Sequence, residues 1–211
     1  MSGATSYLVL RRDAAAEIEV KRSRFLATLV RVDSEDAARA VVERLRKEHW
    51  DARHHCSAII VGPPPTPVQR SSDDGEPAGT AGAPMLEVLR GAGLSDTVAV
   101  VTRWFGGTLL GAGGLVRAYG DAVRAALDAA GTRERRLRLE LALEVDHADA
   151  GRVEGELRAR GVDVLGTTWG AAVQLVLGVD PAAEAATRAL VAEVTGGTAE
   201  ASTTGQRWVD A

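Results

Sequence analysis

Arg136-Leu137-Arg138-Leu139-Glu140-Leu141-Ala142-Leu143-Glu144-Val145 is the stretch that decides the fold of the C-terminal part of this 211-residue chain. Every second residue is a leucine or valine, and most of the residues between them are charged. This period of two is typical of a strand that buries one face and exposes the other. The stretch therefore predicts the first strand of a sheet that is covered on one side.

The residues that follow complete a recognisable order of elements. A helix with apolar residues at 150, 153 and 157 is ended by Gly161, and two strands are predicted from Val162 and over 173–179. Asp180 and Pro181 open a second helix that ends at Gly196, and residues 198–208 can supply a fourth strand. The order is βαββαβ, which is the ferredoxin-like arrangement.

The N-terminal part has a different pattern, and it predicts a second α+β domain. Residues 7–32 are strand-rich, and Ser34 is expected to cap a helix with apolar residues at 38, 41, 42 and 45. Short apolar runs at 56–61 and 98–101 predict buried strands, and helices are expected over 84–90 and from residue 115 to Gly131. We expect domains at 1–135 and 136–211, with the charged stretch 132–136 as the linker.

Composition indicates an ordinary globular protein, with 45% hydrophobic and 26% charged residues. The single cysteine, Cys56, cannot form an internal disulfide or a multi-thiolate metal site, and it suits a reducing compartment. The apolar run 7–10 is followed at once by Arg11 and Arg12, so it predicts neither a signal peptide nor a membrane span. We therefore expect a cytoplasmic protein.

Charge is unevenly divided between the two parts. Residues 1–135 hold 18 basic and 17 acidic residues, whereas residues 136–211 hold 7 and 12. Because binding to phosphate backbones needs clustered positive charge, any contact with nucleic acid is expected to be local and confined to the N-terminal part.

The segment from Arg70 to Thr80, RSSDDGEPAGT, places Asp73, Asp74 and Glu76 within four positions. Like charges this close need a compensating partner. One interpretation is a metal, amine or acid/base site. The other, equally weighted, is a turn and helix entry in which the acids accept hydrogen bonds from backbone amides.

A glycine-rich segment, residues 102–117, lies between a predicted strand and a predicted helix. Its five glycines would let backbone amides approach an anion beside a helix N-terminus, although close packing is the favoured explanation. Arg103, at the end of a buried strand, needs an anionic partner, for which Asp73, Asp74 and Glu76 are the candidates. Arg117 is expected to pair with Asp121 one helical turn away.

Two further groups of residues could carry chemistry. Strand alternation places His54 and Cys56 on one face and His55 on the other. A cysteine–histidine nucleophile pair is conceivable, but an inert buried cysteine is favoured, and we predict no metal and no cofactor. Lys21, Arg22 and Arg24 with Phe25 form a basic run that suits a phosphate backbone with stacking or simply a solvated strand end.

Taken together, these motifs resemble those of the IMPACT family, and of its bacterial YigZ-type members in particular. The matching stretches are 21–25, Ala52-x-His54-x-Cys56, 72–82, and Arg103-x-Phe105-Gly106-Gly107 continuing through 113–119. Two positions depart from the family pattern: Trp104 replaces a common tyrosine, and Leu109 replaces a lysine of many eukaryotic members.

The resemblance implies a fold and a theme. It implies an N-terminal domain like domain 2 of ribosomal protein S5, as in the fourth domain of elongation factor G, and a ferredoxin-like domain like that factor's fifth. Eukaryotic members regulate translation through protein partners, so a regulator that binds RNA, the ribosome or a translation-associated protein is implied. The ligand-binding candidates are Lys21, Arg22, Arg24, His54, Asp73, Asp74, Glu76, Thr80, Arg103, Gly106, Gly107, Gly111, Gly113, Gly114 and Arg117.

Two alternatives remain beside this interpretation. The first is a hydrolase of small molecules or dipeptides in which Asp73, Asp74 and Glu76 act as acid/base or metal-recruiting groups and His54 carries protons. The second is a purely structural role, in which the motifs hold an unusual turn. The lack of a complete nucleophile pair or metal-ligand set favours binding over catalysis.

Overall fold

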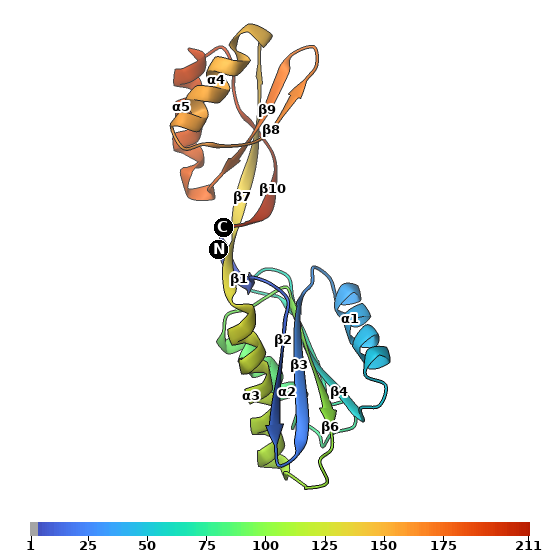
Figure 1. The fold of residues 1–211 in the computed structure, drawn as a ribbon. Helices are drawn as coiled ribbons and strands as arrows, with labels where there is room; N and C mark the ends of the chain where they lie inside the picture. Colours follow the sequence, from blue (N-terminus) through green and yellow to red (C-terminus); the bar gives the residue numbers. More distant parts are fainter. Residues whose placement is uncertain (1–3) are drawn as a thin grey trace. The chain divides into compact units, whose positions relative to one another are not determined.

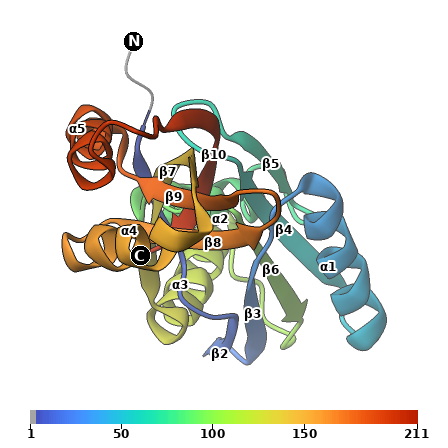
Figure 2. The ribbon, with the colours of Figure 1, turned by 90° about the horizontal axis from the view of Figure 1, so that it is seen from above.

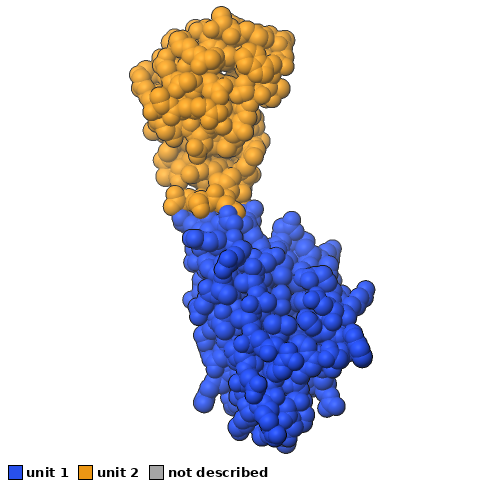
Figure 3. Space-filling model, in the orientation of Figure 1, with its two compact units in different colours: residues 1–135 blue, residues 136–211 orange. Residues whose placement is uncertain are grey.

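The computed structural model describes residues 4–211. They form two compact units, which are residues 4–135 (unit 1) and residues 136–211 (unit 2) (Figure 3). Unit 1 is built from β1 (Ser6–Leu10), β2 (Ala14–Val20), β3 (Ser23–Arg31), α1 (Glu35–Glu48), β4 (His54–Val61), β5 (Val68–Ser72), α2 (Gly82–Gly91), β6 (Thr97–Trp104) and α3 (Ala112–Ala130). None of the helices in the described part of the chain has the length and apolar composition needed to cross a bilayer.

Unit 1 centres on a five-stranded antiparallel sheet of order β2-β3-β6-β4-β5. Helices α2 and α3 cover one face, with Phe25, Cys56, Val101 and Tyr119 in that core, and α1 covers the other face, over Val98 and Val100. Figures 1 and 2 show α1 and α3 on opposite sides of the sheet. The continuous apolar runs in β4 and β6 follow from burial on both faces.

The start of α1 and its apolar face match the sequence prediction. Ser34 accepts a hydrogen bond from the amide of Ala37, and Ala38 and Leu45 are buried. Strand β5 was not predicted, because it is a polar edge strand whose residues are mostly exposed. Helix α3 begins three residues before the predicted Leu115, since Gly113 and Gly114 belong to its first turn. Gly131 ends it, as expected.

Unit 2 contains most of β7 (Thr132–Val145), followed by α4 (His147–Ala159), β8 (Asp163–Trp169), β9 (Val173–Val179), α5 (Glu184–Thr195) and β10 (Ser202–Asp210). Strand β7 lies between β9 and β10, and β8 is at the edge beside β9. This confirms the α+β class and the ferredoxin-like order. Leu141, Leu143, Leu175 and Leu177 form the core beneath α4 and α5.

Two local expectations about this part of the chain need revision. The stretch 132–136, expected as the linker, contains the boundary between the two units but is strand, since β7 begins at Thr132 and pairs with β1. Arg135 also forms an ion pair with the buried Asp96 at 2.6 Å, within unit 1. Asp180 caps a single 3-10 turn over Pro181–Ala183, and α5 starts only after that turn.

Candidate functional site

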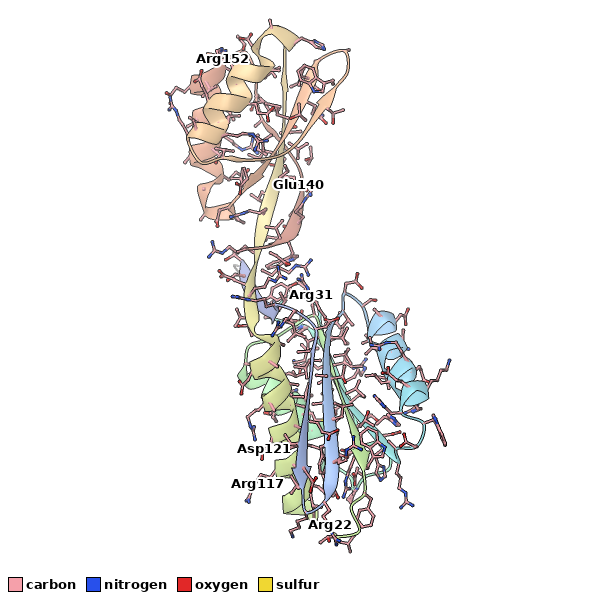
Figure 4. All side chains as sticks on the ribbon, in the orientation of Figure 1. Arg22, Arg31, Arg117, Asp121, Glu140 and Arg152 are labelled. Carbon is pink, nitrogen blue, oxygen red and sulfur yellow. The ribbon has the colours of Figure 1, made fainter. Side chains whose placement is uncertain are left out.

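The strand register of unit 1 brings the predicted motifs to one end of the sheet. Arg24 of β3 is opposite Trp104 of β6, and Arg103 is opposite His54 of β4. The β2–β3 turn, the start of β4 and the β6–α3 loop therefore meet at this end, which we call the motif end. Figure 4 shows Arg22 and Arg117 at the same end of unit 1.

The three acidic side chains have separate partners inside unit 1. The carboxylate of Asp73 accepts hydrogen bonds from the amides of Gly79, Ala81 and Gly82 at 2.8, 3.0 and 2.8 Å, and so caps the start of α2. Partial burial raises the pKa of Asp73, but the three amide donors prevail and the pKa lies below its ordinary value. For Asp73 the turn and helix-entry interpretation is confirmed.

Asp74 links three segments of the chain. Its carboxylate accepts from the amide of His55 at 2.7 Å and from the guanidinium of Arg46 at 3.0 Å. Its own amide donates to Ser72 at 3.3 Å, and its φ is 42°, in the left-handed region. Asp74 therefore connects the tight turn within residues 70–80, which we call the acidic segment, to β4 and α1.

Glu76 is the partner of Arg103, one of the three that the sequence allowed. The two groups lie 2.6 Å apart, with side-chain exposures of 4% and 7%. The hydroxyl of Tyr119 also donates to Glu76 at 2.7 Å. This pairing satisfies two groups whose burial alone would be costly.

Cys56 and the two neighbouring histidines have the predicted orientations. Cys56 lies in the core beneath α3, where its thiol contacts the carbonyl of Asp73 at 3.0 Å and the hydroxyl of Tyr119 at 3.3 Å. Burial raises the pKa of Cys56 to about 12, so the thiol is not a nucleophile at neutral pH. Burial lowers the pKa of His55, against the opposite effect of Asp74.

The predicted glycines act mainly through backbone geometry. A Cβ on Gly106 would lie 2.0 Å from the carbonyl carbon of Arg22, so only glycine allows the β6–α3 loop to contact the β2–β3 turn. Gly107 and Gly111 have positive φ values of 84° and 70°. Gly114 packs closely against the Cβ of Leu110. Thr80, the remaining uncharged candidate, has a structural contact as well, since its hydroxyl donates to the carbonyl of Pro77 at 2.7 Å.

A pocket of about 390 Å³ opens at the motif end, and we call it the motif pocket. Of the predicted site residues, His54, Glu76, Arg103 and Gly111 line it. The other lining residues are Arg53, Pro77, Phe105, Leu109, Leu110, Ala112 and Leu115. These seven were not among the predicted ligand-binding residues, although Phe105 belongs to the family motif and Leu109 marks a departure from the family pattern.

The remaining predicted residues lie outside the motif pocket. Arg117 and Gly113 line a separate groove between α2 and α3. The predicted Arg117–Asp121 pair is wrong, because Asp121 pairs with Arg124 at 2.8 Å. Arg24 pairs with Glu17 at 2.8 Å, and its guanidinium carbon lies 4.7 Å from the centre of the Trp104 ring. Exposed Arg22 donates to Thr108 at 3.1 Å.

Comparison with known proteins supports one family for the whole chain. A protein-family model described as "Impact N-terminal domain" matches residues 21–127. A second family model, described as a domain of unknown function (DUF1949), matches residues 143–198. IMPACT family member YvyE of Bacillus subtilis (strain 168) is 46% identical over 153 residues, which are 72% of this chain and 70% of that protein.

Two further matches cover most of the chain. IMPACT family member YigZ of Escherichia coli (strain K12) is 41% identical over 182 residues, covering 86% of this chain and 89% of that protein. A solved structure titled "Crystal structure of an hypothetical protein" is 38% identical, with a TM-score of 0.66, and covers 94% of this chain and 97% of its own.

Proposed function

This chain belongs to the IMPACT family, and we propose that it regulates translation in the cytoplasm by binding RNA at the motif end of unit 1. The observation that carries the proposal is the meeting of exposed cations with a largely apolar, aromatic-walled pocket at one end of the sheet. RNA recognition needs both features, since cations attract the phosphates and aromatic faces stack on unpaired bases.

The cations at this end lie on three segments that are distant in sequence. Lys21 and Arg22 form the tip of the β2–β3 turn, Arg53 precedes β4, and Arg117 is on the first turns of α3. All four are exposed. Because unit 1 as a whole is close to neutral, with 18 basic and 17 acidic residues, this gathering of cations is a local feature of the kind that phosphate contacts require.

The carboxylates favour binding over hydrolysis. Asp73 accepts three amide donors, Asp74 accepts from His55 and Arg46, and Glu76 accepts from Arg103 and Tyr119. A general acid or base must be able to reach a substrate proton, and groups committed to such networks act first as structural supports. A turnover screen in which Asp74→Ala matches the parent on every substrate would set hydrolysis aside.

The test is co-sedimentation of the full chain with ribosomes from the same cells at low and moderate salt. We expect the parent to sediment with ribosomes at low salt and to be released as salt rises, since phosphate contacts release counterions. The double substitution Arg22→Ala, Arg53→Ala removes exposed charge without breaking the buried Arg103–Glu76 pair. It should abolish sedimentation.

The matched control is Arg39→Ala, Arg44→Ala, which removes two charges from α1, where their side chains are 66% and 57% exposed. It should sediment like the parent. If parent and both variants sediment equally, the motif end is not the ribosome-binding surface. Sedimentation without any binding to purified ribosomal RNA would indicate a ribosome-associated protein as the partner.

A further inference from the structure

We propose that the motif pocket holds one unstacked nucleotide of single-stranded RNA, with the base against Phe105 and the leucines and a phosphate at the N-terminus of α3. This inference rests on the proposed function and names the ligand of the same site. It differs from general RNA binding, because it requires a base, and not only phosphates, to be recognised.

The walls of the motif pocket suit a flat apolar group. Phe105 is 49% exposed and Leu109 is 82% exposed, while Leu110 and Leu115 form the inner side. The volume of about 390 Å³ lies in the lower part of the roughly 300–1,000 Å³ range of small-ligand sites. Apolar groups remain exposed here in a loop whose other residues are glycines and Thr108, and a bound base would remove them from water.

One end of the pocket is suited to an anion. Helix α3 is 19 residues long, and its first backbone hydrogen bond runs from Leu115 to Gly111. The amides of Ala112, Gly113 and Gly114 therefore lack acceptors within the helix, and no side chain in the described part of the chain caps this end. Ala112 and Gly111 line the pocket, so this N-terminus faces it.

A second, independent feature is Arg103, which also lines the pocket. It is 6% exposed, and its Nε has no hydrogen-bond acceptor among the described residues, even though one terminal nitrogen pairs with Glu76. That nitrogen is enclosed by protein, so Arg103 contributes to the pocket through its positive charge and not through a hydrogen bond from Nε. Exposed Arg53 adds a second cation to the pocket lining.

His54 contributes a hydrogen-bond acceptor to the same pocket. Its Nδ1 lies 2.8 Å from the carbonyl oxygen of Asp74, which can only accept, so Nδ1 carries the proton. In the neutral ring Nε2 is then an acceptor. The exocyclic amino group of a base or a ribose hydroxyl could donate to it. The pocket thus combines an apolar wall, an anion site and one acceptor, as a nucleotide requires.

The occupant must be single-stranded. In a duplex the faces of the bases are stacked on one another and cannot reach Phe105, whereas an unpaired base can turn into the pocket. The cations of Lys21 and Arg22 at the β2–β3 turn would contact neighbouring phosphates of the strand.

The experiment compares two RNA oligonucleotides of equal length, one normal and one abasic, by fluorescence anisotropy with the full chain. Both have the same phosphates, so binding through charge alone would treat them equally. We expect the parent to bind the normal strand about tenfold more tightly, the effect of stacking one base on an aromatic ring. Phe105→Ala should lose this preference and bind the abasic strand as the parent does, and Phe105→Trp should keep it.

The control is Trp169→Ala, which removes an aromatic ring that is 64% exposed on β8 of unit 2. It should behave like the parent with both strands. Equal, salt-sensitive binding of normal and abasic strands by the parent would overturn the nucleotide pocket and leave the proposed function standing. Failure of the parent to bind either strand at low salt would overturn both.

Discussion

At the scale of single residues, the motif end is organised by a buried network of four side chains. Arg103 and Tyr119 both donate to Glu76, and Cys56 contacts Tyr119 from the neighbouring strand. Burial is the main cause of the raised pKa of Tyr119, to which Cys56 and Glu76 add. The phenol therefore stays protonated and donates to Glu76. The network spans β4, β6, α3 and the acidic segment, so it fixes the floor of the motif pocket.

Removing one partner of the buried Arg103–Glu76 ion pair should lower the stability of the fold. We expect Glu76→Ala to lower the free energy of unfolding by about 3 kcal/mol, because it leaves the Arg103 charge buried without a counterion. Urea denaturation measures this change in the free energy of unfolding. The control Glu87→Ala removes an exposed carboxylate of α2, with 68% of its side chain accessible, and should change stability by less than about 1 kcal/mol. Equal effects of the two would mean that the pair is not structural.

Asp73 should make part of the stability depend on acid. Because its pKa is lower in the folded protein, its contribution is present above the unfolded pKa and is lost as pH falls through the folded value. Asp73→Asn should cost about 2 kcal/mol at pH 7, and the curves of parent and variant should converge as pH falls through the lowered pKa of folded Asp73. Asp128→Asn, an exposed acid of α3, is the control and should leave the pH profile unchanged.

At the scale of elements, the β2–β3 turn combines strain with charge. Val20 pairs with Ser23, so Lys21 and Arg22 form a two-residue turn, and both have positive φ, 48° and 66°. Asparagine and glycine are the residues that suit such turns. Two long cations in left-handed conformations are unfavourable locally, which supports a role for these side chains outside the fold.

Replacing these residues should separate stability from binding. We expect Lys21→Asn, Arg22→Gly to raise the free energy of unfolding by about 1 kcal/mol, because the strained conformations are relieved. The same variant should bind RNA more weakly, as measured by anisotropy. The swap Lys21→Arg, Arg22→Lys keeps both charges and should leave both quantities unchanged. Unchanged binding by the first variant would remove this turn from the proposed RNA site.

At the scale of the molecule, the two units have separate cores. Leu143 and its neighbours form the core of unit 2, while Phe25 and Tyr119 lie in the main core of unit 1. Because the cores are separate, each unit is expected to be able to unfold without the other. Destabilising unit 2 alone therefore tests whether RNA binding depends on unit 1 only.

A core substitution in unit 2 should test this separation. Leu143→Ala is expected to lower the stability of unit 2 by roughly 2–5 kcal/mol, since it leaves a cavity at a fully buried position. Hydrogen exchange should lose protection within residues 136–211 and keep it within residues 4–135. RNA binding should be retained. A simultaneous loss of protection in both units would show that they unfold as one.

The sequence by itself determined the features that depend on near neighbours. The alternation over residues 137–145, the Ser34 cap, the glycine stops and the opposite faces of His54 and His55 all follow from local backbone geometry. Tertiary structure decided the pairing of Arg103 with Glu76, the exposed edge strand β5 and the assembly of the motif pocket from Arg53, Phe105 and Leu115. The physical reason is that partner choice depends on strand register and helix packing. These bring together residues that are distant in the chain, such as Glu76 with Arg103, 27 positions away, and with Tyr119, 43 positions away.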